Sequence, residues 1–543
     1  MMLAAILLTV YRMIVLPVQF QDRPLSQTRQ EIKATVEQAE AYFNRQYGGQ
    51  TTFRFELAPV TTLSREAAWY GTDQGGKKDI HLHEAVREAI DKQQGFLNLS
   101  LYDNDSDGYV DNICLLTAGP GEQESGKEDD IRPQATRLSD NGGTLRAGEK
   151  TIDLFTACPE GRLGIFCHEF GHVLGLKDLY DTDGEFSEGT SPGLYGLSLM
   201  DEGCLKDTPP DFTAAEFELL GLGRCDTLAV KHYNLPSLLE GRTYLKALTP
   251  HKDEFFLFGN DNGRLLVHHI DRSDNPAGYS TRLNTELTAR ERWEANAVND
   301  NPEHPCAVLI PADPDAPVPD RFAFPRPGVS HFGSDSPVPF RSWGGSTSAL
   351  ALTDIRVQAD KSISFDVIEP VLLTDLTVFQ DAAILCWQVS DKLQGIQGIE
   401  VSWTDGEEEF HMTLSPQTAG YTLENLKPKT EYSVTIRVHT GDRASFSVSV
   451  PLLTKIYREG IFPYIYLNNI TRNLDGSFPA GTRIPLRVFN ATDVQDVRWT
   501  MDGAAINPGP DGRYTLNASG TLKATILHTD GTSEILLKEI IVQ

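Results

Sequence analysis

The spacing of hydrophobic positions changes repeatedly along the first hundred residues. An apolar, β-branched run from Arg12 to Phe20 predicts a buried strand. Leu25 to Tyr47 carries apolar residues at helical spacing and is followed by two glycines, which predicts an amphipathic helix with a defined end. Thr51 to Leu57 alternates apolar and polar residues and predicts a half-buried strand. His81 to Phe96 predicts a second amphipathic helix, so this region is α+β or α/β.

The same alternation of strands and helices continues to about residue 228. Ile113 to Gly119 and Lys150 to Ala157 predict two more buried strands. The second leads into an apolar helix, and Phe212 to Leu222 predicts a further helix with Asp211 or Thr213 as its cap.

After residue 228 the pattern becomes that of short strands separated by Pro- and Gly-rich turns. The runs are Thr243–Leu248, Glu254–Gly259, Arg264–Ile270, Ala307–Ile310 and Ser362–Ile368. We expect one of His268 and His269 to face a buried hydrogen-bond partner. Asn296, Asn299, Asp300 and Asp313 are interpreted as braces of loops.

The remaining sequence predicts two β-sandwiches. The run from Gly420 to Ile436 resembles the fibronectin type III pattern, in which Leu426 and Tyr432 brace a corner before a core strand. Trp499 followed by Asp502 and Gly503 suggests a small Ig-like domain. A chain of 543 residues exceeds one hydrophobic core. We therefore predict four domains, at 1–228, 229–369, 370–456 and 457–543.

The strongest chemical signal is the pentapeptide His168 to His172, which has the pattern H-E-x-x-H. On a helix the two histidines lie one turn apart on the same face, where their imidazoles can hold one zinc ion. Glu169 then lies beside the metal without binding it, where a general base would take a proton from a metal-bound water.

The residues that follow predict the rest of the zinc site. Gly175 can end the helix, and Asp178 then returns as a third ligand, leaving the fourth position open as in catalytic zinc sites. Asp181 is the alternative third ligand. Met200 lies in a Gly-rich segment that resembles the Met-turn beneath the zinc of metzincin proteases.

A second metal site is predicted at the Asp-rich segment 103–111. Its alternating carboxylates before Gly108 resemble the front half of a calcium loop, although the terminal Glu of a complete EF-hand loop is missing. The alternative is a polar turn without an ion. The predicted calcium-loop residues are Asp103, Asp105, Asp107, Tyr109 and Asp111. Asp181 and Asp183 give a weaker signal for another cation site.

Composition limits the classes of partner. The formal net charge of −28 argues against nucleic acid or an anionic membrane as partner, and no apolar stretch is long enough to span a bilayer. Seven cysteines without a C-x-x-C pair do not imply a disulfide framework. The apolar start, Met1 to Val10, lacks a basic segment and a clear cleavage site, so a signal sequence is not evident, although we expect a secreted or cell-surface protein.

These motifs resemble the immune inhibitor A family of secreted bacterial metalloproteases. The resemblance rests on 168–181, 197–203 and 103–112, and on shorter runs at 41–48 and 265–271. It implies a metzincin-like α+β catalytic domain followed by β-sandwich domains. It also implies zinc at His168, His172 and Asp178, Glu169 as general base, Met200 as the Met-turn, and calcium for stability.

The function implied is hydrolysis of peptide bonds in extracellular proteins or peptides. The alternative is a surface adhesin or binding protein on an inactive protease scaffold, because β-sandwich modules commonly bind a surface glycan or protein. The intact H-E-x-x-H motif favours the enzyme, since an inactive site would be free to lose Glu169.

Overall fold

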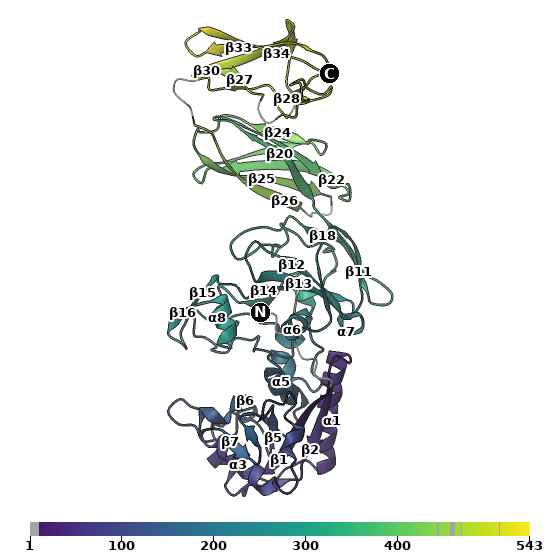
Figure 1. The fold of residues 1–543 in the computed structure, drawn as a ribbon, viewed down its shortest axis with the longest axis vertical. Helices are drawn as coiled ribbons and strands as arrows, with labels where there is room; N and C mark the ends of the chain where they lie inside the picture. Colours follow the sequence, from purple (N-terminus) through teal and green to yellow (C-terminus); the bar gives the residue numbers. More distant parts are fainter. Residues whose placement is uncertain (1–9, 442–444, 457–461, 468–469, 510) are drawn as a thin grey trace.

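The structure, a computed structural model, describes residues 10–441, 445–456, 462–467, 470–509 and 511–543. Residues 1–9, which make up most of the apolar start from Met1 to Val10, lie outside the described residues. The chain runs along one long axis, from an α/β region through a β-rich region to two β modules (Figure 1). Among the described residues, no helix has both the length and the apolar character needed to cross a membrane.

The N-terminal region is built on a six-stranded sheet with the order β2-β1-β5-β9-β6, in which β3 also pairs with β1. The strands are β1 (Val10–Gln19), β2 (Thr52–Leu57), β3 (Thr61–Thr62), β5 (Ile113–Thr117), β6 (Gln134–Arg137) and β9 (Leu154–Pro159). Only β6 runs antiparallel to its neighbour. Parallel strands are covered on both faces, and β5 is accordingly buried at all of its positions.

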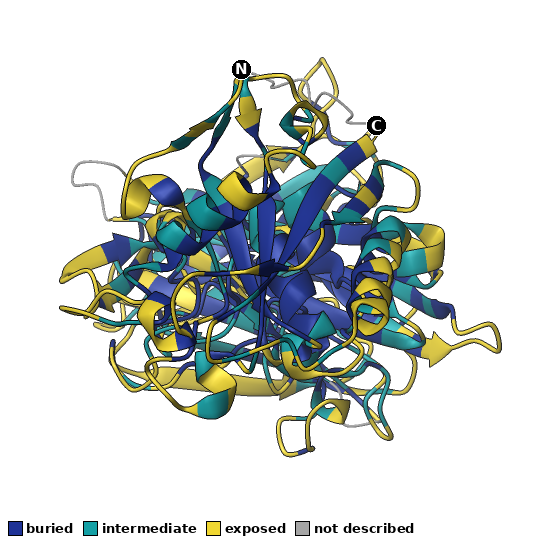
Figure 2. Cartoon of the chain, turned by 90° about the horizontal axis from the view of Figure 1, so that it is seen from below, coloured by how far each residue is buried: buried dark blue, intermediate teal, exposed yellow. Residues whose placement is uncertain are grey.

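Helices cover both faces of this sheet. The helices of the whole described chain are α1 (Arg29–Tyr47), α2 (Ala67–Tyr70), α3 (Leu82–Gln93), α4 (Glu122–Ser125), α5 (Leu163–Val173), α6 (Ala214–Leu220), α7 (Leu238–Gly241) and α8 (Ala289–Glu294). Alternate residues of β1 point to opposite faces: Met13 joins the core under α1 and α5, whereas Ile14 joins the core under α3. In Figure 2 the strands lie buried in the middle and the outer helix surfaces are exposed.

Local sequence explains where these helices begin. The predicted helix from Leu25 starts at Arg29, because Thr28 and Glu31 form a reciprocal capping box there. It ends at Gly48, which has a φ of 55°. Of the two predicted caps for the helix near 212–222, Thr213 is the one that caps α6, again with a capping box.

The expected single strand from Lys150 to Ala157 is wrong, because the chain forms two strands there. β8 (Lys150–Ile152) joins a small sheet with β4 (Tyr109–Val110) and β7 (Leu145–Ala147), whereas β9 joins the main sheet. Asp153 separates them, and its carboxylate accepts hydrogen bonds from Arg137 Nη1 and the Ser139 N–H.

The β-rich region shares a core with the N-terminal region. Its main sheet has the order β10-β12-β13-β14-β17. The strands of this region are β10 (Arg224–Thr227), β11 (Lys231–Leu235), β12 (Thr243–Leu248), β13 (Glu254–Asp261), β14 (Arg264–Asp271), β15 (Pro276–Ser280), β16 (Thr285–Thr288), β17 (Ala307–Leu309), β18 (Ala351–Val357) and β19 (Ile363–Ile368). Leu257 packs in the same cluster as Phe170 of α5, whereas Phe256 belongs to a separate cluster on the opposite face. One continuous core therefore runs across residue 228.

Two β modules follow. The first pairs a sheet β20-β21-β24 with a sheet β23-β22-β25-β26. Its strands are β20 (Val371–Val378), β21 (Ala383–Val389), β22 (Ile396–Thr404), β23 (Glu409–Leu414), β24 (Gly420–Leu423), β25 (Glu431–Thr440) and β26 (Ser445–Leu453). Tyr432 Oη accepts the Lys427 N–H at 2.9 Å, which is the expected tyrosine corner.

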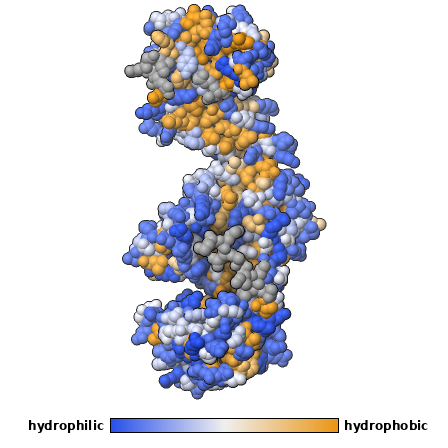
Figure 3. Space-filling model, in the orientation of Figure 1, coloured by the Kyte–Doolittle hydropathy of each residue, from blue (hydrophilic) through white to orange (hydrophobic). Residues whose placement is uncertain are grey.

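The last module has a sheet β31-β30-β33-β34 and the pairs β27–β29 and β28–β32. Its strands are β27 (Tyr464–Ile465), β28 (Arg483–Pro485), β29 (Val488–Phe489), β30 (Val494–Met501), β31 (Ala504–Ile506), β32 (Arg513–Thr515), β33 (Gly520–His528) and β34 (Ser533–Ile540). On the face in Figure 3, the two C-terminal modules carry extensive hydrophobic areas. All seven cysteines are free thiols, four of them buried.

Candidate metal centre

Helix α5 presents His168 and His172 on one face. Their Nε2 atoms lie 3.2 Å apart, and the ring planes meet at 87° with centroids 4.7 Å apart. The helix itself is buried from Gly164 to Gly171. The separation of one helical turn therefore brings two imidazole nitrogens to a common point, as predicted.

Each imidazole is oriented by a backbone carbonyl on its other nitrogen. His168 Nδ1 lies 3.1 Å from the Leu199 carbonyl, and His172 Nδ1 lies 3.1 Å from the Leu176 carbonyl. A proton on Nδ1 donates to each carbonyl and leaves the Nε2 lone pair free for a metal.

Asp178 completes the group from the loop after the helix. α5 ends at Val173, and the chain reverses through Gly175, which has a φ of 103°. Asp178 Oδ1 then lies 3.1 Å from His168 Nε2 and 3.3 Å from His172 Nε2. Asp181, the alternative ligand, lies in a different carboxylate group.

Asn296 holds Asp178 from the β-rich region. The Asn296 side-chain amide donates to Asp178 Oδ2 at 2.6 Å, and its carbonyl oxygen accepts the Asp178 N–H at 2.9 Å. Asp178 Oδ1 is buried and accepts no hydrogen bond among the described residues, so it remains free to bind a cation. Nothing in the local sequence around Asn296 could have identified this contact.

Met200 lies directly beneath the helix. It is fully buried, and a Cβ atom placed on Gly171 would come within 2.8 Å of its sulfur. The Met200 carbonyl accepts the Leu179 N–H at 2.8 Å, so this turn also supports the loop that carries Asp178. Met200 therefore supports both the helix and the loop after it, and its role as a Met-turn stays a prediction.

The electrostatics of the group favour a positive charge at its centre. Burial opposes protonation of His168, but the Asp178 carboxylate outweighs it, so the pKa of this imidazole is raised. Burial of Asp178 is likewise outweighed by contact with His168 and His172, which lowers the pKa of its carboxyl. A divalent cation would replace the shared proton. Two nitrogens and one carboxylate oxygen fit zinc, with a fourth position left for water.

Glu169 is buried beside this group. Only 5 % of it is exposed, and burial raises the pKa of its carboxyl, an effect that His168 and His172 oppose. A raised pKa brings a carboxylate nearer the pH at which a general base works best.

The Asp-rich loop forms a second carboxylate group, made by Asp103, Asp105 and Asp111. Asp107 lies outside this group, and its Oδ1 accepts the Tyr109 N–H at 2.7 Å. Lys150 Nζ forms a close ion pair with Asp103 in this loop. That ammonium neutralises part of the charge that a calcium ion would otherwise balance.

Two family profiles match the chain. Residues 17–217 match the profile described as immune inhibitor A peptidase M6, catalytic domain, and residues 374–452 match the fibronectin type III domain. Immune inhibitor A of Bacillus thuringiensis subsp. alesti is 28 % identical over 188 residues, which is 27 % of this chain and 26 % of that protein. Pre-pro-metalloprotease PrtV of Vibrio cholerae serotype O1 (strain M66-2) is 26 % identical over 191 residues, 30 % of this chain and 20 % of that protein.

The matches therefore span about a quarter or less of these relatives' own lengths. Among solved structures, a computationally redesigned β-sandwich protein is 26 % identical, covering 17 % of this chain and 99 % of that chain at a TM-score of 0.16. A fibronectin type III domain of human collagen XX is 18 % identical, covering 15 % of this chain and 90 % of that chain at a TM-score of 0.14. The two family matches confirm the predicted resemblance, since residues 17–217 are similar to the immune inhibitor A (M6) peptidase catalytic domain and residues 374–452 to a fibronectin type III domain.

Proposed function

We propose that the chain is a secreted or cell-surface zinc endopeptidase that hydrolyses peptide bonds of extracellular proteins. The observation that carries this proposal is the convergence of His168, His172 and Asp178 beside the buried Glu169. The match of residues 17–217 to a peptidase catalytic domain supports it. Fibronectin type III modules are common in cell-surface proteins, which supports the proposed location.

In this proposal, His168, His172 and Asp178 hold the metal. Zinc supplies a water of lowered pKa and polarises the scissile carbonyl. Glu169 accepts the proton of the attacking water and then donates it to the leaving amine. The two backbone carbonyls and Asn296 keep the three ligands in place, so little reorganisation is needed during turnover.

The test combines metal content with hydrolysis of casein or gelatin before and after phenanthroline. We expect bound zinc and chelator-sensitive cleavage in the wild type. Glu169→Ala should retain zinc and lose nearly all hydrolysis, whereas Glu240→Ala, at an exposed position, should leave both unchanged. Unchanged hydrolysis in Glu169→Ala, or a folded protein that binds no zinc, would refute the proposal.

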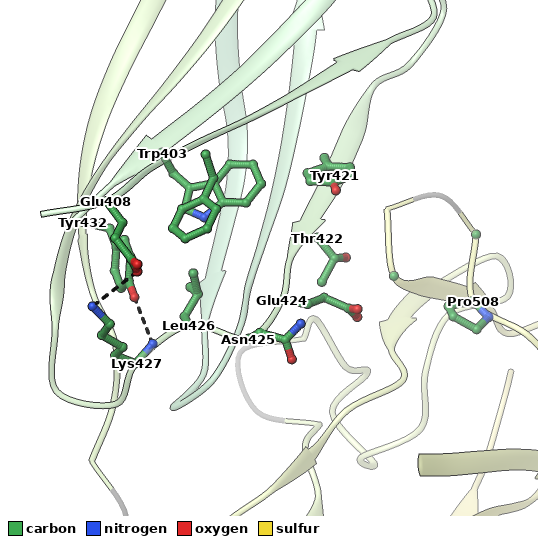
Figure 4. Close-up of a pocket in the computed structure, with 13 residues that line it drawn as sticks. Trp403, Glu408, Tyr421, Thr422, Glu424, Asn425, Leu426, Lys427, Tyr432 and Pro508 are labelled. Carbon is green, nitrogen blue, oxygen red and sulfur yellow. Dashed lines mark hydrogen bonds and ion pairs between the residues drawn. The ribbon is translucent and has the colours of Figure 1, made fainter. Parts of the chain in front are cut away.

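A second candidate function is glycan binding by the C-terminal modules. A cavity of about 550 Å³ lies between the fibronectin type III module and the last module. Trp403 and Phe410 stack in it with centroids 5.6 Å apart and planes 17° apart, and Tyr421 and Pro508 face the same space (Figure 4). Near-parallel, stacked aromatic rings beside carboxylates and amides suit the apolar face and hydroxyls of a sugar.

This second candidate is tested by glycan-array binding with zinc removed. Retained binding in the wild type and loss in Trp403→Ala would support it. Equal binding by both proteins, or no binding by the wild type, would refute it. Neither result depends on the peptidase test.

A further inference from the structure

A third carboxylate group is formed by the loop that follows Asp178 together with a segment of the β-rich region. Asp181 and Asp183 come from the loop after Asp178, and Asp300 comes from the segment that also carries Asn296. One oxygen of each carboxylate lies within 4.8 Å of those of the other two. Three negative charges at this distance repel one another strongly unless a cation lies between them.

Two oxygens in this group are buried without a hydrogen-bond donor. Asp300 is fully buried, and its Oδ2 accepts no hydrogen bond from any described residue. Asp183 Oδ1 is also buried and accepts none, although Asp183 as a whole is half-buried. Leaving a buried charged oxygen unpaired is costly, so these two atoms indicate a missing positive partner.

The other oxygens of the group are already occupied. Asp300 Oδ1 accepts from both the N–H and the hydroxyl of Thr182, each at 2.8 Å. Asp183 Oδ2 accepts from the Ser187 hydroxyl at 2.6 Å. Asp181 accepts three backbone N–H groups from its own loop, which are those of Asp183, Gly184 and Ser191. In Asp183 and Asp300, the hydrogen bonds to one carboxylate oxygen therefore fix the position of the other, unpaired oxygen.

Arg282 neutralises only part of the negative charge of this carboxylate group. Its Nη2 lies 3.8 Å from Asp300 Oδ2, beyond hydrogen-bond distance, and its side chain is 43 % exposed. The buried Arg292 guanidinium also attracts Asp300 and Asp183, but its hydrogen bonds go to backbone carbonyls and not to either carboxylate. These two guanidiniums do not fully balance three carboxylates. The group thus retains an excess of negative charge.

We propose that Asp181, Asp183 and Asp300 bind Ca²⁺ at a site separate from both the His168 group and the Asp103 loop. The three donors are carboxylate oxygens, without nitrogen or sulfur, which suits a hard cation. Ca²⁺ accepts irregular geometry and completes its shell with backbone oxygens and water, whereas Mg²⁺ demands near-octahedral geometry.

The site would fasten together two segments that are distant in sequence. Asp178 and Asn296 are 118 residues apart, as are Thr182 and Asp300, and both pairs are hydrogen-bonded. A cation between Asp183 and Asp300 adds a third link to the same junction. Its binding should therefore stabilise the loop that presents Asp178.

The experiment uses the full chain, freed of Ca²⁺ with EGTA and titrated calorimetrically with CaCl₂ or MgCl₂. The variants are Asp183→Asn, Asp300→Asn, the double variant Asp103→Asn/Asp105→Asn, and the control Asp391→Asn at an exposed position. We expect Asp183→Asn to bind one Ca²⁺ fewer than the wild type, or to weaken one site by at least about tenfold. The double variant should retain this site, and the control should match the wild type.

A second readout is the rise in melting temperature caused by Ca²⁺, which should be smaller in Asp183→Asn and Asp300→Asn than in Asp391→Asn. If Asp300→Asn does not fold, the half-buried Asp183→Asn decides the question. Identical stoichiometry, affinity and Ca²⁺-dependent melting in the wild type and Asp183→Asn would overturn the proposal. Equal binding of Mg²⁺ would overturn the assignment to Ca²⁺. Neither readout requires peptidase activity.

Discussion

Asn296 clamps Asp178 through both ends of its amide, donating to Asp178 Oδ2 at 2.6 Å and accepting the Asp178 N–H at 2.9 Å. This arrangement fixes the carboxylate so that Oδ1 points toward the two imidazoles. Asn296 lies beyond residues 17–217, the part that matches the peptidase profile. The β-rich region therefore supplies part of the candidate metal centre, and it also shares a hydrophobic core with the region that carries the histidines.

Replacing Asn296 with glycine should loosen the proposed third ligand. Asn296 has a φ of 52°, which glycine adopts without strain, so the variant removes the side chain and leaves the backbone undisturbed. Loss of such an outer partner typically lowers metal affinity by about 10–100-fold. We expect a decrease of this size in zinc affinity, measured by competition with a chromogenic chelator.

Asn262→Gly provides a matched control for that experiment. Asn262 is exposed and also left-handed, with a φ of 50°, but lies in the turn between β13 and β14. If both variants bound zinc as tightly as the wild type, the two hydrogen bonds between Asn296 and Asp178 would have no effect on zinc affinity.

Gly164 permits a close approach between α5 and the turn after Met200. A Cβ atom on Gly164 would lie 2.2 Å from the Cys204 carbonyl oxygen and 2.9 Å from that of Lys206. Both are backbone atoms, so side-chain rotation cannot relieve the overlap. Gly164→Ala should cost about 1–3 kcal/mol by overpacking, more than the roughly 1 kcal/mol that alanine gains in a helix.

Thermal unfolding and zinc affinity measure this effect. Gly95→Ala is the control, because Gly95 has open space around its Cβ direction and no positive φ. We expect the control to melt at or slightly above the wild-type temperature. If Gly164→Ala melted like the control, the close approach would be refuted.

Local sequence patterns are sufficient to predict much of the fold. The strand near 12–20, the helix ending at Gly48 and the tyrosine corner at Tyr432 all depend on residues close in sequence. The group of His168, His172 and Asp178 spans only eleven residues, so spacing alone could suggest it. Each of these features is fixed by short-range geometry.

Long-range contacts could not be predicted in the same way. The sequence indicates only loop braces at Asn296 and Asp300, because their partners lie 118 residues away and the sequence does not specify how the two segments meet. The break between β8 and β9 at Asp153 likewise has no local signal, since Asp153 is held by hydrogen bonds from Arg137 and Ser139. In both places the local structure depends on contacts with residues that are distant in sequence.

Removing the hydroxyl of Tyr432 should weaken the fibronectin type III module. Tyr432→Phe leaves the Lys427 N–H without its acceptor, which should cost about 1–3 kcal/mol. This loss of stability should appear as faster amide hydrogen exchange between residues 370 and 441 in Tyr432→Phe than in the wild type. Tyr421→Phe is the control in the same module, because the Tyr421 hydroxyl makes no hydrogen bond to the described residues. Equal exchange in both variants would refute the role of the corner.

His268 should make the protein sensitive to acid. Its ring is fully buried in β14, neither ring nitrogen has a hydrogen-bond partner among the described residues, and burial lowers its pKa to about 3. The unfolded chain takes up a proton near pH 6.5, whereas the folded chain stays neutral. The free energy of unfolding should therefore fall as the pH drops below 6.5, by about 2 kcal/mol at pH 5 from this residue.

His268→Leu removes the titrating group and keeps an apolar side chain among Leu257 and Leu309, its neighbours on adjacent strands. Urea unfolding of the wild type and the variant at pH 7 and pH 5 isolates the contribution of His268, because any other group that titrates in this range is present in both proteins. We expect the variant to lose about 2 kcal/mol less than the wild type between these pH values. An equal loss in the two proteins would mean that His268 is protonated in the folded state, which would require an acceptor near its ring that the structure does not contain among its described residues.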